Sequence, residues 1–111
     1  MTNPQKIKGD RAEREAAAII AGLLGYPARR KLGAGRADDT GDIDGIPATV
    51  VQVCDWKDKV RAMRVKPREC EQQQVNDAAT FGATWVRLHG GEWRVVLTPE
   101  QWATYVREAL R

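Results

Sequence analysis

The residues with the most chemical potential are two acids, Glu13 and Asp42, and the pair Gln52 and Cys54. Metal-dependent phosphodiester hydrolysis needs oxygen ligands for Mg²⁺ and usually a cation near the scissile phosphate. Two adjacent strands can supply them, with an Asp on the first strand and an acid and a lysine on one face of the second. A Glu from a helix can complete the set. Asp42 and Glu13 suit two of these positions, whereas Gln52 and Cys54 stand where the acid and the lysine are expected.

The exchange of an acid and a lysine for Gln52 and Cys54 changes the chemistry of the predicted site. A glutamine offers Mg²⁺ a neutral oxygen, and a cysteine thiol is soft and mostly neutral at pH 7. Lys57 is then the best available cation, because its long side chain could reach the site from the end of the strand. Alternatively, a bulge in the strand could let Asp55 and Lys57 act as a displaced Asp-x-Lys pair.

Each of these residues also has a purely structural interpretation. Glu13 follows Asp10 at the spacing of a capping box, in which both would serve only to begin a helix. Asp42 could belong to ordinary turn chemistry. Gln52 could be a satisfied polar residue of a strand, and Cys54 a small buried hydrophobic residue.

The elements that must position these residues follow from apolar periodicity and turn signals. Apolar residues at helical spacing follow Asp10, and β-branched residues dominate the segment that carries Gln52. Pro67 suits the first turn of a helix, and Thr98 is the N-cap of the last helix. The expected elements are a helix over 10–24, a strand over 26–32, a glycine-rich turn over 33–41, a short strand over 42–47, a central strand over 48–56, a basic connector over 57–66, a helix over 67–81, strands over 83–88 and 93–97, and a helix from 99 onward.

This order predicts an α/β fold in which helices flank a small mixed β-sheet, in the sequence αβββαββα. The chain has 111 residues, so we expect a single domain over residues 10–111 after a flexible N-terminal segment, residues 1–9. No segment approaches the roughly 20 apolar residues that cross a bilayer, so we expect no membrane association. Two cysteines do not make a disulfide framework, which favours a reducing cytoplasm. The aromatic residues Trp85, Trp93, Trp102 and Tyr105 are expected to belong to the core.

The charge distribution is more informative than the net charge of +3. Basic residues concentrate in two segments on either side of an acidic one, a pattern that would suit phosphate contacts. The first segment contains Lys6, Lys8, Arg11, Arg14, Arg29, Arg30, Lys31 and Arg36, and the second contains Lys57, Lys59, Arg61, Arg64, Lys66 and Arg68.

Two motifs resemble one known family. The run 8–15, Lys-Gly-Asp-Arg-Ala-Glu-Arg-Glu, is similar to the opening of archaeal-type Holliday-junction resolvases and their phage relatives. The run 41–47, Gly-Asp-Ile-Asp-Gly-Ile-Pro, with the strand 50–54 after it, resembles the phage versions, in which that strand usually ends Glu-Val-Lys. The resemblance covers roughly residues 8–110 and implies a restriction-endonuclease-like fold of the PD-(D/E)xK superfamily.

The resemblance implies a phage-type endonuclease that cuts branched or duplex DNA as a homodimer, with Mg²⁺ or Mn²⁺ as cofactor. It places Glu13 and Asp42 at metal-binding acids, Gln52 at the second acid and Cys54 at the lysine. We therefore expect Glu13, Asp42 and Gln52 to hold metal and Lys57 to supply the catalytic cation. Phosphate contacts are expected from Lys8, Arg11, Arg30 and Lys57.

The loss of the acid and the lysine leaves a second hypothesis open. The fold could have lost catalysis and serve as a DNA-binding protein, or as a structural component of a phage particle in contact with other phage proteins. The endonuclease would act in the cytoplasm, that of the host if a phage encodes the chain, whereas the structural protein would belong to the virion.

Overall fold

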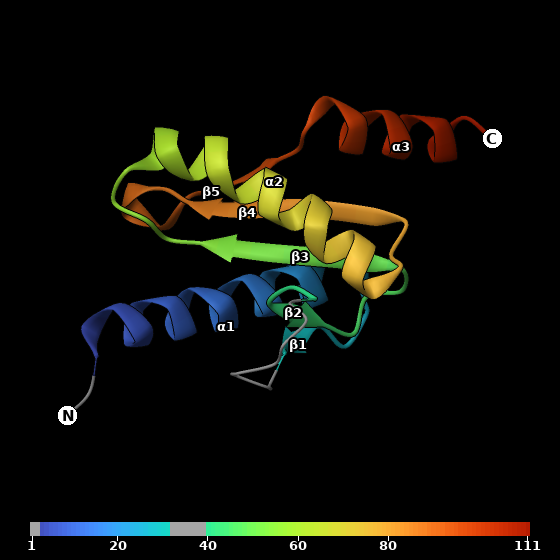
Figure 1. Ribbon diagram of the computed structural model, residues 1–111. Coiled ribbons are helices and arrows are strands. Elements are labelled where there is room, and N and C mark those ends of the chain that lie inside the picture. Colours follow the sequence, from blue (N-terminus) through green and yellow to red (C-terminus); the bar gives the residue numbers. More distant parts are fainter. Residues whose placement is uncertain (1–2, 32–39) are drawn as a thin grey trace.

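The computed structural model describes residues 3–31 and 40–111, which form an α/β fold with helices on both faces of a mixed sheet (Figure 1). The predicted order αβββαββα is confirmed. The elements of this part of the chain are α1 (Pro4–Leu24), β1 (Arg29–Arg30), β2 (Ile43–Asp44), β3 (Thr49–Cys54), α2 (Lys59–Asp77), β4 (Phe81–Arg87), the short 3₁₀ turn η1 (His89–Gly91), β5 (Trp93–Val96) and α3 (Pro99–Ala109).

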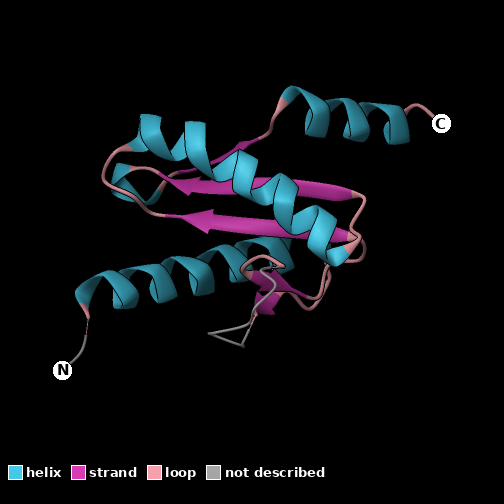
Figure 2. Cartoon of the chain, in the orientation of Figure 1, coloured by secondary structure: helices cyan, strands magenta, loops and turns pink. Residues whose placement is uncertain are grey.

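The sheet has the strand order β1-β2-β3-β4-β5. Its central pair, β3 and β4, is parallel, and the other neighbouring pairs are antiparallel. A parallel pair needs a long crossover, which α2 supplies, whereas β4 and β5 form the hairpin that the sequence predicts (Figure 2). The first two strands are much shorter than predicted, and part of the expected first strand and most of the glycine-rich turn lie outside the described residues.

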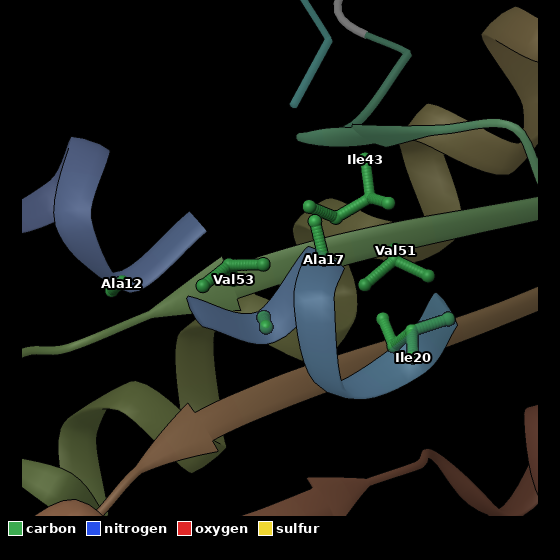
Figure 3. Close-up of a cluster of buried hydrophobic side chains, with 7 residues drawn as sticks. Ala12, Ala17, Ile20, Ile43, Val51 and Val53 are labelled. Atoms are coloured by element: carbon green, nitrogen blue, oxygen red, sulfur yellow. The ribbon is translucent and has the colours of Figure 1, made fainter. Parts of the chain in front are cut away.

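Strand β3 is the centre of the fold because both of its faces are covered. Val51 and Val53 pack with Ile43 and with the α1 residues Ala12, Ala16, Ala17 and Ile20 in an apolar cluster (Figure 3). Side chains alternate along a strand, so Val50, Gln52 and Cys54 face the other side. There α2 covers them, and its Cys70 contacts the Val50 carbonyl. All five residues from Val50 to Cys54 are buried.

Helix α1 begins earlier than the sequence predicts. Its N-cap is Asn3, whose side chain accepts from the Gln5 amide, and Pro4 occupies the first helical position. Residues 4–9, predicted to be a flexible segment, therefore form its first turns. The predicted capping box of Asp10 and Glu13 is wrong, because both residues lie inside the helix and bind Arg30 instead.

Helix α2 also begins earlier, and the predicted basic connector over 57–66 is wrong for most of its length. The Asp58 side chain caps the helix by accepting from the Arg61 amide. Pro67 lies within the helix, where it is buried, although the sequence suggests that it begins one. A proline inside a helix removes one backbone hydrogen bond, so tertiary packing here outweighs a local preference.

Helix α3 begins at the predicted cap, but the side of it that carries Trp102 faces solvent. Thr98 and Gln101 form the expected capping box, with the Gln101 amide bound to Thr98 Oγ1 at 3.1 Å and the Thr98 amide to Gln101 Oε1 at 3.0 Å. Only one side of the helix packs: Tyr105 stacks on Phe81, and burial raises the Tyr105 pKa to about 12. The expectation that Trp102 belongs to the core is wrong, because it is 59% exposed.

The capping box gives a direct test of how α3 is held. Thr98 Oγ1 also donates to Glu71 Oε2 at 3.1 Å, so Thr98→Ala removes a helix cap and a link to α2 together. We expect it to lower the free energy of unfolding by about 1–2 kcal/mol, measured by urea denaturation. Thr98→Ser keeps the hydroxyl and should cost much less. Equal losses in the two variants would show that the hydroxyl does not hold the helix.

Candidate functional site

Asp42 and Gln52 lie together where β2 meets β3. The pairing of Ile43 with Val51 places Asp42 beside Gln52 on the neighbouring strand. The Asp42 amide donates to the Val51 carbonyl at 2.8 Å, and Asp42 Oδ2 accepts from the Val53 amide at 2.8 Å. One carboxylate oxygen thus extends the β2–β3 hydrogen-bond ladder.

Gln52 is enclosed between the sheet and α2. Gln52 is only 5% exposed, and its side-chain oxygen Oε1 has no hydrogen-bond partner among the described residues. Thr84 pairs with Gln52 on the neighbouring strand β4, and its buried hydroxyl also has no hydrogen-bond partner among the described residues. A buried polar atom without a partner costs roughly 1–3 kcal/mol. The α2 side of the sheet therefore includes buried polar side chains, in contrast to the wholly apolar cluster under α1.

Cys54, at the position of the expected lysine, is an uncharged group on the same side of the sheet. It is 3% exposed, and burial raises the pKa of its thiol above the usual range. The charges of Lys66 and Lys59 partly offset that effect. Both lysines come from α2 and have other partners: Lys59 Nζ lies 3.2 Å from Asp55, and Lys66 Nζ lies 2.9 Å from Glu69 and over the Trp56 ring.

Glu13 is held by Arg30 on the α1 side of the sheet. It extends from α1, on the opposite face of the sheet from the Gln52 side chain, and accepts from Arg30 Nε at 3.2 Å. Arg30 Nη2 donates to Asp10 Oδ1 at 2.8 Å. A hydrogen bond from Lys6, together with the Arg30 charge, lowers the pKa of Asp10. Arg30, a predicted phosphate contact, is therefore held by two carboxylates that link β1 to α1.

The displaced Asp55 and Lys57 pair does not form by a bulge. The β3–β4 register runs residue for residue from Thr49 to Cys54, and the strand ends there. Asp55 is mostly buried and lies between Lys59 and Lys8, whose Nζ is 3.9 Å away. Lys57 is exposed, as its predicted role in phosphate contact requires.

The described residues do not fit the magnesium site that the sequence predicts. Mg²⁺ in such sites is bound through one or two carboxylates together with waters. Glu13 lies on the other face in an ion pair, and the Gln52 oxygen is shut off from solvent, which leaves Asp42 as the one predicted ligand at the edge of β3. Among residues 3–31 and 40–111, no group of three or more His, Cys, Asp or Glu side chains is arranged to hold a metal ion.

Cations gather instead at one end of the molecule. The ion pair between Lys8 and Asp55 brings the N-terminal half of α1 beside the end of β3 and the start of α2, as Figure 1 shows. Several exposed basic side chains of these segments form no ion pair within the described part of the chain, namely Arg11, Lys57 and Arg64. Arg61 lies over the Trp56 ring at 5.2 Å. We call the surface formed by Lys8, Arg11, Lys57, Arg61 and Arg64 the basic end.

A shallow groove extends the positive charge along α1. It has a volume of about 480 Å³ and is lined by Arg14, Arg29, Arg30 and three alanines. The sequence shows these arginines as members of one basic segment, but it does not show that β1 places two of them beside Arg14. The same is true of α2, whose helical start brings Arg61 and Arg64 next to the end of β3.

Comparisons with known proteins add no relative: no family model, curated protein or solved structure matches the chain. The helices that the structure describes are all too short or too polar to cross a membrane.

The unpartnered Gln52 oxygen predicts an unusual mutational effect. Gln52→Met removes the buried oxygen and keeps the side-chain length, so we expect the free energy of unfolding to rise by about 1 kcal/mol. Gln101→Met is the matched control, because Gln101 is equally buried but binds Thr98 and Gln74. It should destabilise the fold. Urea denaturation measures both. A clear loss of stability in Gln52→Met would mean that Oε1 has a partner, such as a buried water.

Proposed function

We propose that the protein is a DNA-binding protein with a restriction-endonuclease-like fold, in which the basic end holds the phosphate backbone and phosphodiester cleavage is impaired. The nuclease-like motifs around Glu13 and Asp42, together with the αβββαββα order, support the choice of fold. The observation that carries the binding proposal is the group of exposed cations at the basic end that lack carboxylate partners in the described residues.

The position of these cations favours a phosphate ligand. Surface lysines and arginines that already form ion pairs lose them when they bind a phosphate, whereas Arg11, Lys57 and Arg64 have no such pair among the residues that the structure describes. Binding of this kind releases counterions and is therefore strongly dependent on salt. Trp56 adds a partly buried ring to the same surface, held under Arg61 and Lys66.

The chemistry of β3 favours binding over cleavage. Hydrolysis by a site of this type uses a negative metal ligand and a positive lysine on the central strand. Gln52 is neutral, and the raised pKa of Cys54 keeps its thiol neutral as well. Glu13 lies in an ion pair with Arg30 on the other face of the sheet.

Neutralising the basic end should weaken DNA binding without altering the fold. We expect Arg11→Gln and Lys57→Gln each to lower the affinity for duplex DNA roughly three- to tenfold at low salt, and to reduce the slope of log affinity against log salt by about one. Arg111→Gln removes an exposed arginine far from the basic end, where it pairs with Glu108, and should leave both quantities unchanged. Equal effects in all three variants would place the interface elsewhere.

An active endonuclease is the second candidate, and one observation favours it. Asp42 lies beside Gln52, and the charges of Lys59 and Lys66 act on Cys54, so parts of the expected charge pattern remain nearby.

A cleavage assay on a four-way DNA junction with Mg²⁺ or Mn²⁺ separates the two candidates, with duplex and single strands as controls. We expect the natural chain to leave the junction intact. Gln52→Glu with Cys54→Lys restores the expected acid and lysine, and cleavage by that variant alone would show a nuclease fold that has lost its activity. Circular dichroism must show that the variant is folded, because it buries two charges. Cleavage by the natural chain that Asp42→Ala abolishes would contradict the proposal.

A further inference from the structure

A second groove, which we call the apolar groove, lies on the face of the sheet that α1 covers. It has a volume of about 490 Å³ and is bounded by the end of α1, by strands β3 to β5 and by α3. Leu24, Trp85, Val95 and Leu97 are among the apolar residues that line it, and Leu24 and Val95 are 56% and 51% exposed. Because a ligand that covers such side chains removes apolar surface from water, the apolar groove is a candidate binding site.

The hydroxyl groups in the apolar groove already donate within the protein. Thr49 Oγ1 donates to the Pro47 carbonyl at 2.8 Å, and Tyr105 Oη donates to the Gly82 carbonyl at 3.2 Å. Neither hydroxyl proton is therefore offered to a ligand. Since most of the other lining residues are apolar, a ligand would be held mainly through its own apolar part.

Glu108 is the one charged residue among the described residues that line the apolar groove. It lies in the last turn of α3, where a carboxylate is unfavourable for the helix dipole, so the stability of the helix does not explain its presence. Its ion-pair partner is Arg111, at 3.1 Å, whose side chain is 74% exposed. An exposed pair of this kind contributes little, so a ligand cation can replace Arg111 at the carboxylate.

We propose that the apolar groove binds a small amphiphile with one apolar chain and one cationic amine, with the amine beside the Glu108 carboxylate and the chain along Trp85, Val95 and Leu97. The volume lies in the range of roughly 300–1,000 Å³ that is typical of small-molecule sites, in which a few polar groups orient a mostly apolar ligand. A protein partner would need a much wider surface of roughly 800 Å². The net charge of the protein is +3, so preference for a cation must come from Glu108 and not from the overall charge.

Two amphiphiles with the same chain and opposite charges test this proposal, namely octylammonium and octanoate. Each is titrated into the natural chain at low salt without DNA, and the backbone amides are followed by ¹H–¹⁵N NMR spectroscopy. We expect octylammonium to give saturable shifts at Trp85, Val95 and Leu97. It should bind at least about fivefold more tightly than octanoate, because the carboxylate attracts one head group and repels the other.

Reversal of the charge at the groove should reverse this preference. Glu108→Lys places a cation where the helix dipole favours one, so the variant should remain folded, which urea denaturation checks. It should bind octanoate more tightly than octylammonium. Glu100→Lys is the matched control, because it makes the same charge change in the first turn of α3 and should keep the natural preference.

Three results would overturn the proposal. The first is a natural chain that shows no saturable shifts with octylammonium at millimolar concentration. The second is a set of shifts confined to the basic end. The third is a Glu108→Lys variant that keeps the preference of the natural chain. Because the titrations contain no DNA, their outcome is independent of the proposed DNA binding.

Discussion

The burial of β3 between two helices is the constraint on which the rest of the structure depends. Val51 and Val53 on one side and Gln52 and Cys54 on the other are all removed from water. A charge in such a place needs a partner and hydrogen bonds, or its pKa shifts until it is neutral. The neutral pair Gln52 and Cys54 meets this constraint without a partner ion, although the Gln52 oxygen finds no hydrogen-bond donor in the described part of the chain. A neutral central strand fits the fold and weakens the case for hydrolysis at the same time.

Because the interior is neutral, the basic surface and the exposed apolar surface of the molecule lie at its two ends. The carboxyl ends of the parallel strands β3 and β4, the first half of α1 and the start of α2 meet at the basic end (Figure 1). The end of α1, the groove and α3 form an apolar end. The chain is elongated, with a longest extent of 50 Å, so these two ends are well separated.

The sequence predicts the order of the elements because β-branched runs, turn residues and caps are local signals. The central strand β3, the β4–β5 hairpin and the Thr98 cap were all within reach of such signals. The sequence does not show where α1 and α2 begin. The observed N-caps are Asn3 and Asp58, but Asp10 and Pro67 also suit the start of a helix, and tertiary packing decides between them. Nor does the sequence show that Glu13 faces Arg30 or that α3 turns its apolar side outward, since both depend on how a helix rotates against the sheet.

The most direct test of the central claim is the salt dependence of duplex DNA binding by the natural chain with Mg²⁺ present, followed by recovery of the DNA. Binding through the basic end predicts an affinity that falls steeply as salt rises, with the DNA recovered intact. DNA that fails to bind even at low salt, or that is recovered cut, would contradict the account.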